Sequence, residues 1–263
     1  FQPAEEIAEG GKDMVAAGIT GKIPVPDVML GQHVMGALPL GHVATNEGIS
    51  FSQASTVKVT VRGVGSHGSM PEKGVDPIVL SSSIIMQLQT IVSRELPASE
   101  RAVVSVGTIH GGTKSNVIPD EVVFELNTRC YSQEVEDHIH ASIERIVNNQ
   151  AAAAGAPEPS FEYSDRFPVL DNDRDVTAKV TESMQTLLGE ERTETFAPLS
   201  ASEDFPDIPN AFGTPYCFWV VGGFPTPENA PGNHSPQFVP ELHPTLEAGA
   251  EATVAALCPW LTV

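Results

Sequence analysis

The order of hydrophobic and polar residues predicts alternating strands and helices in the middle of the chain. From Thr56, the apolar residues Val57, Val59 and Val61 alternate with polar ones, which is typical of a strand with one buried face. Between Thr56 and about Ser164 the pattern predicts, in order, a strand (56–61), a helix (77–92), two strands (103–109 and 122–126), a helix (135–147) and a strand (161–163). This is the order of the split βαβ unit in a ferredoxin-like domain.

The flanking segments carry a different pattern of long helices and fully apolar strands. It predicts a helix (4–18), a buried strand (27–35) entering a Gly/Pro-rich turn (36–41), a helix ending at Gly189 (176–188), a continuous buried strand (216–221) and a closing helix (245–257). We therefore expect an α/β protein in which residues 1–53 and 165–263 form one domain and residues 54–164 form an inserted ferredoxin-like domain.

Length, charge and cysteine count limit the number of domains and the classes of molecule that the protein can bind. The 263 residues suffice for about two domains. A net charge of -20, from 14 Lys and Arg against 34 Asp and Glu, argues against nucleic acid or a membrane as a partner, since binding to phosphate groups needs a basic face. Cys130, Cys217 and Cys258 are odd in number and lack metal-ligand spacing, so we expect reduced core cysteines in a cytoplasmic protein.

Glu5 and Glu6 form a carboxylate pair at the mouth of the first predicted helix. Such a pair suits one Glu binding a metal while the other handles a proton, although a pair taken alone is more often a solvated helix N-terminus. Glu6, His33 and His234 come from three segments at the ends of predicted elements, and a carboxylate with two imidazoles suits zinc, manganese, cobalt or nickel. For His33 a buried structural role stays open. His234, in a polar loop, is favoured as a ligand.

Five segments in order along the chain carry a family resemblance. They are Phe1–Glu6, Gly31–Val34, Gly63–Pro71 with Gly74–Pro77, Ser115–Asp120 with Arg129, and Ser202–Phe205 with Gly232–Pro236. Together they resemble the dinuclear metalloamidohydrolases that include aminoacylases and carboxypeptidase-G-like peptidases, in the branch of hippurate hydrolases and auxin-conjugate amidohydrolases. The resemblance implies a split α/β metallopeptidase-type catalytic domain with an inserted ferredoxin-like dimerisation domain.

The resemblance also implies a role for each matched residue. Glu5 would be the general base, and Glu6, His33 and His234 would be ligands of two divalent metal ions. His67, Asn116 and Arg129 would contact an N-acyl amino acid substrate. An imidazole such as that of His67 can stabilise an oxyanion, and a guanidinium such as that of Arg129 can pair with the substrate carboxylate.

A homodimer formed through the inserted domain is a further implication, with His67 acting in the active site of the partner. We expect the contact at the strand Thr56–Gly63, as an exposed sheet edge, or at the helix Pro77–Val92.

The chain departs from the family pattern in two places. The family's upstream metal ligands would lie before Phe1, and Gly68-Ser69-Met70 stands where small alanines are usual. Two alternatives to an amidohydrolase acting on N-acyl amino acids therefore stay open. One is a non-catalytic dimerisation or ligand-binding module, and the other is a metallocarboxypeptidase acting on peptides.

Overall fold

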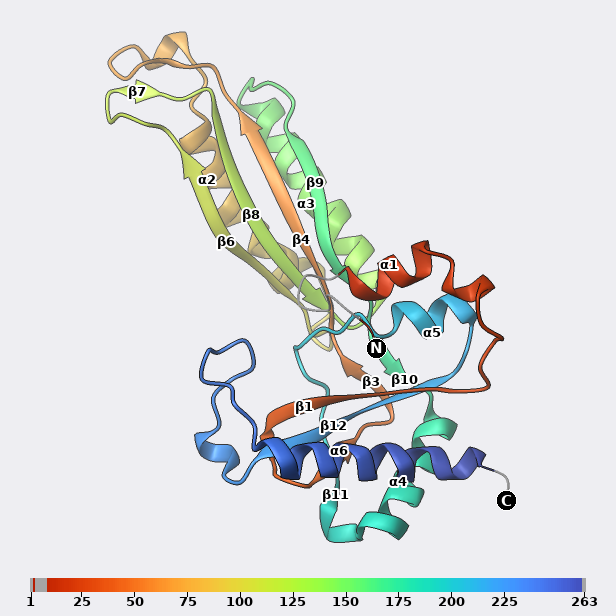
Figure 1. The fold of residues 1–263 in the computed structure, drawn as a ribbon. Coiled ribbons are helices and arrows are strands. Elements are labelled where there is room, and N and C mark those ends of the chain that lie inside the picture. Colours follow the sequence, from red (N-terminus) through yellow and green to blue (C-terminus); the bar gives the residue numbers. More distant parts are fainter. Residues whose placement is uncertain (1, 3–8, 262–263) are drawn as a thin grey trace. The chain divides into compact units, whose positions relative to one another are not determined.

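The computed structural model describes residues 2 and 9–261, which fold into two compact units (Figure 1). Unit 1 comprises the residues up to Phe51 together with 170–199 and 203–263, and unit 2 comprises residues 52–169 and 200–202. Both units mix helices and strands, as the sequence predicts for an α/β protein. Within the described part of the chain, no helix is long and apolar enough to cross a membrane.

Unit 1 is built on a four-stranded sheet with the order β1-β12-β2-β11. The strands are β1 (Met29–Pro39), β12 (Tyr216–Phe224), β2 (Val43–Thr45) and β11 (Thr193–Thr195). β12 runs parallel to β1 and antiparallel to β2, and β2 runs parallel to β11. A separate antiparallel pair joins β3 (Gly48–Phe51) to β10 (Leu170–Asn172).

The central strand β12 is covered on both faces. The helices of unit 1 are α1 (Gly10–Ala16), α4 (Arg174–Leu188), α5 (Asp207–Phe212) and α6 (Leu242–Leu257). Cys217, Trp219 and Val221 belong to a core cluster with residues of α4 and α6. The alternate residues Tyr216, Phe218 and Val220 belong to a second cluster with Phe51 and Leu170. Because neither face of β12 meets water, its sequence is a continuous apolar run, as predicted.

Several predicted boundaries in unit 1 were wrong. β1 continues to Pro39, where the sequence predicted a turn from Gly36. An added Cβ at Gly222 would collide with the Pro39 carbonyl, so glycine allows the close approach that extends the pairing. The chain turns instead at Gly41, which has a φ of 79°. The closing helix begins at Leu242 rather than Thr245. The predicted helix 4–18 is described only from Gly10, since residues 3–8 lie outside the described residues.

The cysteines were predicted to be reduced core residues. All three carry free thiols, and Cys130 and Cys217 are buried. Cys258 is exposed, so its assignment to the core was wrong. Cys258 lies just after α6, in a short 3-10 turn over Cys258–Trp260 that contains no buried residue.

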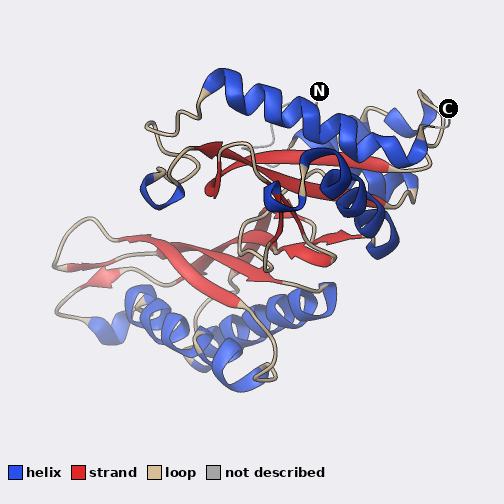
Figure 2. Cartoon of the chain, turned by 90° about the horizontal axis from the view of Figure 1, so that it is seen from below, coloured by secondary structure: helices blue, strands red, loops and turns tan. Residues whose placement is uncertain are grey.

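Unit 2 has the predicted ferredoxin-like topology. Its sheet has the order β6-β8-β4-β9, with β4 (Gln53–Arg62), β6 (Val103–Gly111), β8 (Glu121–Cys130) and β9 (Ser160–Phe167). Every neighbouring pair is antiparallel. Two helices, α2 (Pro77–Leu88) and α3 (Gln133–Ala153), cover one face of this sheet (Figure 2). The alternating residues Val57, Val59 and Val61 of β4 are fully buried beneath these helices.

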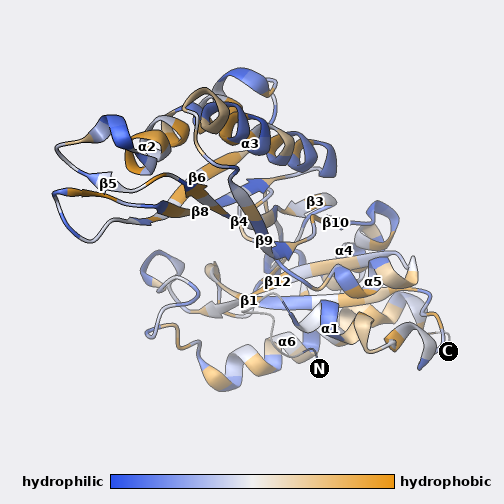
Figure 3. Ribbon diagram, turned by 90° about the horizontal axis from the view of Figure 1, so that it is seen from above, coloured by the Kyte–Doolittle hydropathy of each residue, from blue (hydrophilic) through white to orange (hydrophobic). Residues whose placement is uncertain are grey.

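Polar side chains define the starts of both helices of unit 2. The Asp76 carboxylate accepts from the amides of Ile78 and Val79, and the Ser132 hydroxyl accepts from the Val135 amide. α2 ends at Leu88, earlier than predicted, and a π turn follows over Ile91–Glu95. In Figure 3 α3 is largely hydrophilic, whereas α2 carries more apolar colour.

The expected contact through Thr56–Gly63 as an exposed edge was wrong. β4 lies between β8 and β9, and the outer strands of the sheet are β6 and β9. Apolar side chains are exposed on β6 at Val103 and Ile109, and on α2 at Val79 and Met86. An apolar surface for self-association is therefore present on β6 and α2, but not on β4.

Candidate functional site

His33 lies on β1, opposite Val220 of β12, and is half-buried. Its Nδ1 approaches the carbonyl oxygen of Val34 at 2.6 Å. A carbonyl oxygen has only lone pairs to offer, so Nδ1 must carry the proton and donate it. The other ring nitrogen, Nε2, then has a lone pair, which is the form in which a histidine binds a metal.

The loop that carries His234 is tied to the same point of β1. Asn233 donates from Nδ2 to the Val34 carbonyl at 3.3 Å. His234 itself is exposed and has a φ of 65°, a left-handed conformation that is uncommon outside glycine. Two segments about 200 residues apart in sequence thus meet at one carbonyl oxygen, and each carries a predicted metal ligand next to the contact.

The predicted residues Glu5 and Glu6 lie outside the described residues. Among residues 2 and 9–261, no group of three or more His, Cys, Asp and Glu side chains is arranged to hold a metal ion. His33 and His234 could therefore supply at most part of a ligand set.

A cavity of about 600 Å³ opens beside His33 in unit 1. Its lining combines an apolar wall with polar groups: Gln2, Met14, Leu30, Gly31, Gln32, His33, Glu203, Phe205, Ile208 and Phe218. Glu203 is 5% exposed, and its Oε1 accepts from the Phe205 amide at 3.2 Å. Ser202–Phe205 contributes to the family resemblance, but the sequence pattern predicts no role for Glu203. The available signal was the adjacent acidic pair, Glu203 and Asp204, directly before Phe205 and Pro206.

Asp204 is fully buried next to this cavity. Its Oδ2 accepts from the Gly11 amide at 2.8 Å, and its Oδ1 accepts from Nε2 of Gln2. Nearby, burial raises the pKa of the Asp207 carboxyl to about 6; Lys12 opposes this rise, and the Asp204 carboxylate adds to it. Oδ2 of Asp207 is buried and has no hydrogen-bond partner. The start of α1 is therefore held against the buried carboxylate of Asp204, with the half-buried carboxyl of Asp207 beside it.

In unit 2, His67 and Asn116 are brought together. The two-residue strands β5 (Ser66–His67) and β7 (Val117–Ile118) pair, and the Gly68 amide donates to the Asn116 carbonyl at 2.8 Å. The Ser69 amide donates to Nδ1 of His67 at 3.1 Å, so Nδ1 is an acceptor. In a neutral ring the proton then resides on Nε2, which becomes a donor on an exposed loop.

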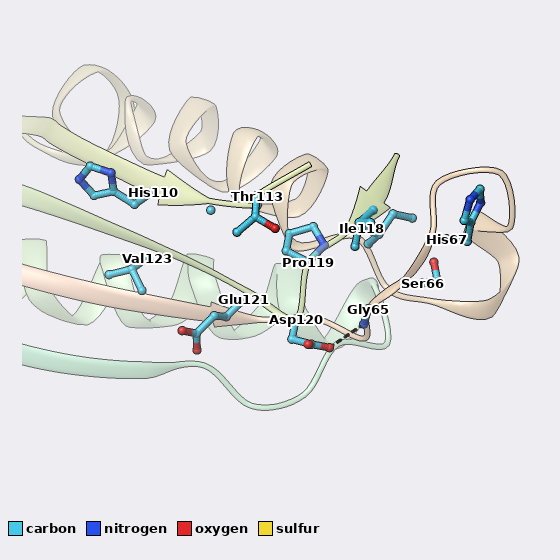
Figure 4. Close-up of a pocket in the computed structure, with 13 residues that line it drawn as sticks. Gly65, Ser66, His67, His110, Thr113, Ile118, Pro119, Asp120, Glu121 and Val123 are labelled. Carbon is cyan, nitrogen blue, oxygen red and sulfur yellow. Dashed lines mark hydrogen bonds between the residues drawn. The ribbon is translucent and has the colours of Figure 1, made fainter. Parts of the chain in front are cut away.

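A wide pocket of about 900 Å³ lies beside His67 (Figure 4). His110, Asp120 and Glu121 contribute to its lining. The Asp120 carboxylate accepts from the Gly65 amide at 2.9 Å, which ties the loop of His67 to the start of β8. This hydrogen bond fixes the backbone of the loop that carries His67 at this end of the sheet.

Arg129 lies near the opposite end of β8. Its Nη1 donates to the carbonyl of Ser200 at 2.6 Å and to the hydroxyl of Ser202 at 3.0 Å. Asp120 precedes β8, and at about 3.4 Å per residue the intervening strand places Arg129 about 30 Å from the loop of His67. The structure therefore brings His67 and Asn116 together but separates both from Arg129.

Comparison with known proteins gives matches along most of the chain. Residues 50–155 match the family described as the peptidase dimerisation domain, which falls within unit 2 apart from its first two residues. N-acetylcysteine deacetylase from Bacillus subtilis is 32% identical over 173 residues, covering 66% of this chain and 44% of the relative. Thermostable carboxypeptidase 2 from Saccharolobus solfataricus is 31% identical over 207 residues, covering 78% of this chain and 51% of the relative.

A solved structure extends the likeness to the fold as a whole. The YXEP protein of Bacillus subtilis, described as a dinuclear metal-binding peptidase of the M20 family, superposes with a TM-score of 0.74 at 25% identity. The match covers 98% of this chain and 64% of that one. The chain spans about half the length of the curated relatives it matches. These matches confirm the resemblance carried by the five segments, and the chain belongs to the M20 family of amidohydrolases and peptidases.

Proposed function

We propose that the protein is a metal-dependent amidohydrolase that cleaves the amide bond of N-acyl amino acids, hippurate-like substrates included. The observation that carries the proposal is the anchoring of His33 and the His234 loop to the carbonyl of Val34. It fixes the His33 ring in the form in which Nε2 can bind a metal. The similarity to an N-acetylcysteine deacetylase supports an N-acyl amino acid as the substrate.

The donor set fits a divalent ion. In this proposal His33, His234 and Glu6 are ligands, and imidazole with carboxylate suits Zn²⁺, Mn²⁺, Co²⁺ or Ni²⁺. A pair of such ions, when bound, supplies the Lewis acidity that activates water near neutral pH and polarises the carbonyl. Glu5 takes the proton of the attacking water and passes it to the amine that leaves.

The residues of unit 2 would contact the oxyanion and the carboxylate of the substrate. His67 offers its Nε2 proton to the oxyanion that forms from the carbonyl oxygen. Asn116, beside His67, contacts the same part of the substrate. Arg129 pairs with the carboxylate of the amino acid, which then replaces the contacts to Ser200 and Ser202.

Both His67 and Arg129 can reach one substrate only if they come from different chains. A distance of about 30 Å along β8 exceeds the size of an N-acyl amino acid. We therefore propose a homodimer formed through unit 2, in which each chain lends His67 to the site of its partner. The match to a dimerisation domain supports this arrangement, and the apolar residues exposed on β6 and α2 supply its surface.

These roles assign one function to each of two domains. We propose that residues 1–53 and 165–263 belong to the catalytic domain, and that residues 54–164 form the inserted dimerisation domain. The free thiols and the large negative charge support a cytoplasmic location, with no nucleic acid or membrane as partner.

A metallocarboxypeptidase acting on peptides is the second candidate, favoured by the similarity to a thermostable carboxypeptidase. The experiment that separates the candidates uses the protein expressed from its complete reading frame and loaded with each of the four metals. Hydrolysis of N-acetyl and N-benzoyl amino acids is compared with hydrolysis of dipeptides that have a free amino group. Faster turnover of the N-acyl amino acids supports the proposal, faster turnover of dipeptides supports the peptidase, and no turnover of either supports a non-catalytic module.

A further inference from the structure

We propose that Asp204 is a positioning residue that clamps Gln2 and the start of α1, the described residues that flank Glu5 and Glu6 in the sequence. Its two carboxylate oxygens accept hydrogen bonds from residues on either side of this pair. Oδ1 accepts from Gln2, three residues before Glu5, and Oδ2 accepts from the amide of Gly11, five residues after Glu6. The inference rests on the proposed function for its catalytic consequence, but the clamp itself is a property of the fold.

Because Asp204 is buried, its carboxylate depends on these hydrogen bonds. Asp204 has no exposed surface, and a carboxylate removed from water needs donors to replace its hydration. The side-chain amide of Gln2 and the backbone amide of Gly11 supply them. A hydrogen bond to a charged acceptor is stronger than one between neutral groups. The carboxylate therefore holds its two donors more firmly than a surface contact would.

The packing around Gly11 shows that this contact is close. A Cβ added at Gly11 would lie 2.6 Å from the backbone oxygen of Asp204 and 3.1 Å from Cβ of Asp207. No other residue type fits there without moving α1 away from α5. Gly10 and Gly11 are both buried, so the first turn of α1 lies directly against the Asp204–Asp207 turn.

Three variants test the clamp in the full-length protein. Asp204→Ala removes both acceptors. Gln2→Ala removes only one contact from a half-buried position, so it should leave the fold intact. Asp204→Asn keeps one acceptor oxygen for the Gly11 amide. Asp13→Ala is the matched control, because it removes an exposed carboxylate from the same helix.

The first readout is hydrogen exchange at the Gly11 amide, measured without substrate or metal. We expect exchange to be at least tenfold faster in Asp204→Ala, little changed in Asp204→Asn, and unchanged in Asp13→Ala. For Gln2→Ala we expect the Gly11 amide to stay protected, because Oδ2 of Asp204 still accepts from it. Unchanged exchange at Gly11 in Asp204→Ala, or equally faster exchange throughout unit 1, would overturn the clamp.

The second readout is steady-state kinetics with N-acyl amino acids. We expect kcat to fall by tenfold or more in Asp204→Ala with KM within about threefold of wild type, and to fall by less in Asp204→Asn. Loss of Gly11 protection with unchanged kcat would overturn the catalytic consequence. If the wild-type enzyme hydrolyses no N-acyl amino acid while Asp204→Ala still loses Gly11 protection, the proposed function fails and the clamp stands.

Discussion

His33 and Asn233 share one acceptor, the carbonyl oxygen of Val34. The imidazole approaches it at 2.6 Å and the amide at 3.3 Å, from segments of the chain that are 200 residues apart. The shared oxygen fixes the ring orientation of one proposed metal ligand and the loop of the other, His234. Histidines that bind metals are commonly oriented in this way, by a hydrogen bond from the ring nitrogen that does not bind the metal.

Removing the Asn233 amide should therefore weaken metal binding without removing a ligand. For Asn233→Ala we expect metal affinity to fall by about tenfold, within the range of about 10- to 100-fold typical of residues that orient ligands. Calorimetric titration of the metal-free, full-length protein measures this. Gln237→Ala, in the same loop, serves as the control and should keep wild-type affinity. Unchanged affinity in Asn233→Ala would show that the loop is held in place by other contacts.

The stability of unit 1 should depend on the pH through Asp207. The pKa of this carboxyl is raised from 3.8 to about 6, so the folded state binds its proton more tightly than the unfolded state. The resulting stabilisation is present below pH 3.8 and is lost as the pH rises to about 6. Asp207→Asn should remove this loss and raise the free energy of unfolding at pH 8 by roughly 1 kcal/mol, a value reduced for the partial exposure of the side chain.

Urea unfolding at pH 4.5 and pH 8 checks the prediction for Asp207. The difference between Asp207→Asn and wild type should be larger at pH 8. Asp175→Asn, on the first turn of α4, is a control carboxyl in the same unit. A larger gain at pH 4.5 than at pH 8 would mean that the sign of the shift is wrong.

The dimer should depend on α2 and on the β6 edge. Met86 and Val79 are 72% and 66% exposed on α2, so Val79→Glu with Met86→Glu should leave the fold of unit 2 intact. In a dimer held by this surface, the buried charges should raise the dissociation constant by 100-fold or more. Sedimentation across a concentration series measures it. Ser164→Glu, on the other outer strand β9, should leave the dimer unchanged. Dissociation by Ser164→Glu alone would place the interface on β9.

Arg129 should select substrates that carry a carboxylate. Loss of a hydrogen-bonded charge is worth about 1.5–3 kcal/mol, so Arg129→Ala should lower kcat/KM for N-acyl amino acids by about 10- to 100-fold. The corresponding N-acyl amino acid amides should be hydrolysed at an unchanged rate. Arg62→Ala, on the same sheet, is the control, because the Arg62 side chain bonds to the Glu158 carbonyl and the Ser160 hydroxyl in an exposed position. Equal losses on both substrate classes would assign Arg129 a structural role at Ser200 and Ser202.

Long periodic segments could be predicted from the sequence, because their pattern is local. The alternation at Val57, Val59 and Val61 identified β4, and the apolar run beginning at Tyr216 identified β12. The short strands β2, β3, β10 and β11 were missed, since three or four residues are too few to show a period. Their pairing depends on tertiary contacts instead.

Sheet order and side-chain partners could not be predicted in this way. Alternation in β4 shows that one face is buried, but not that β8 and β9 pair with its two edges, because these strands lie far along the chain. The same limit applies to Arg129, whose bonds to Ser200 and Ser202 join segments about 70 residues apart. Asp204 was missed for this reason as well: its partners, Gln2 and Gly11, lie near the other end of the sequence.

Mixing two inactive subunits tests the central claim most directly. In the full-length protein, His67→Ala and Glu5→Ala should each abolish hydrolysis of N-acyl amino acids. In a mixed dimer one site carries both lesions and the other carries neither, so an equal mixture that exchanges freely should recover about a quarter of wild-type activity. No recovery, with subunit exchange demonstrated by mass spectrometry, would contradict a site built from two chains.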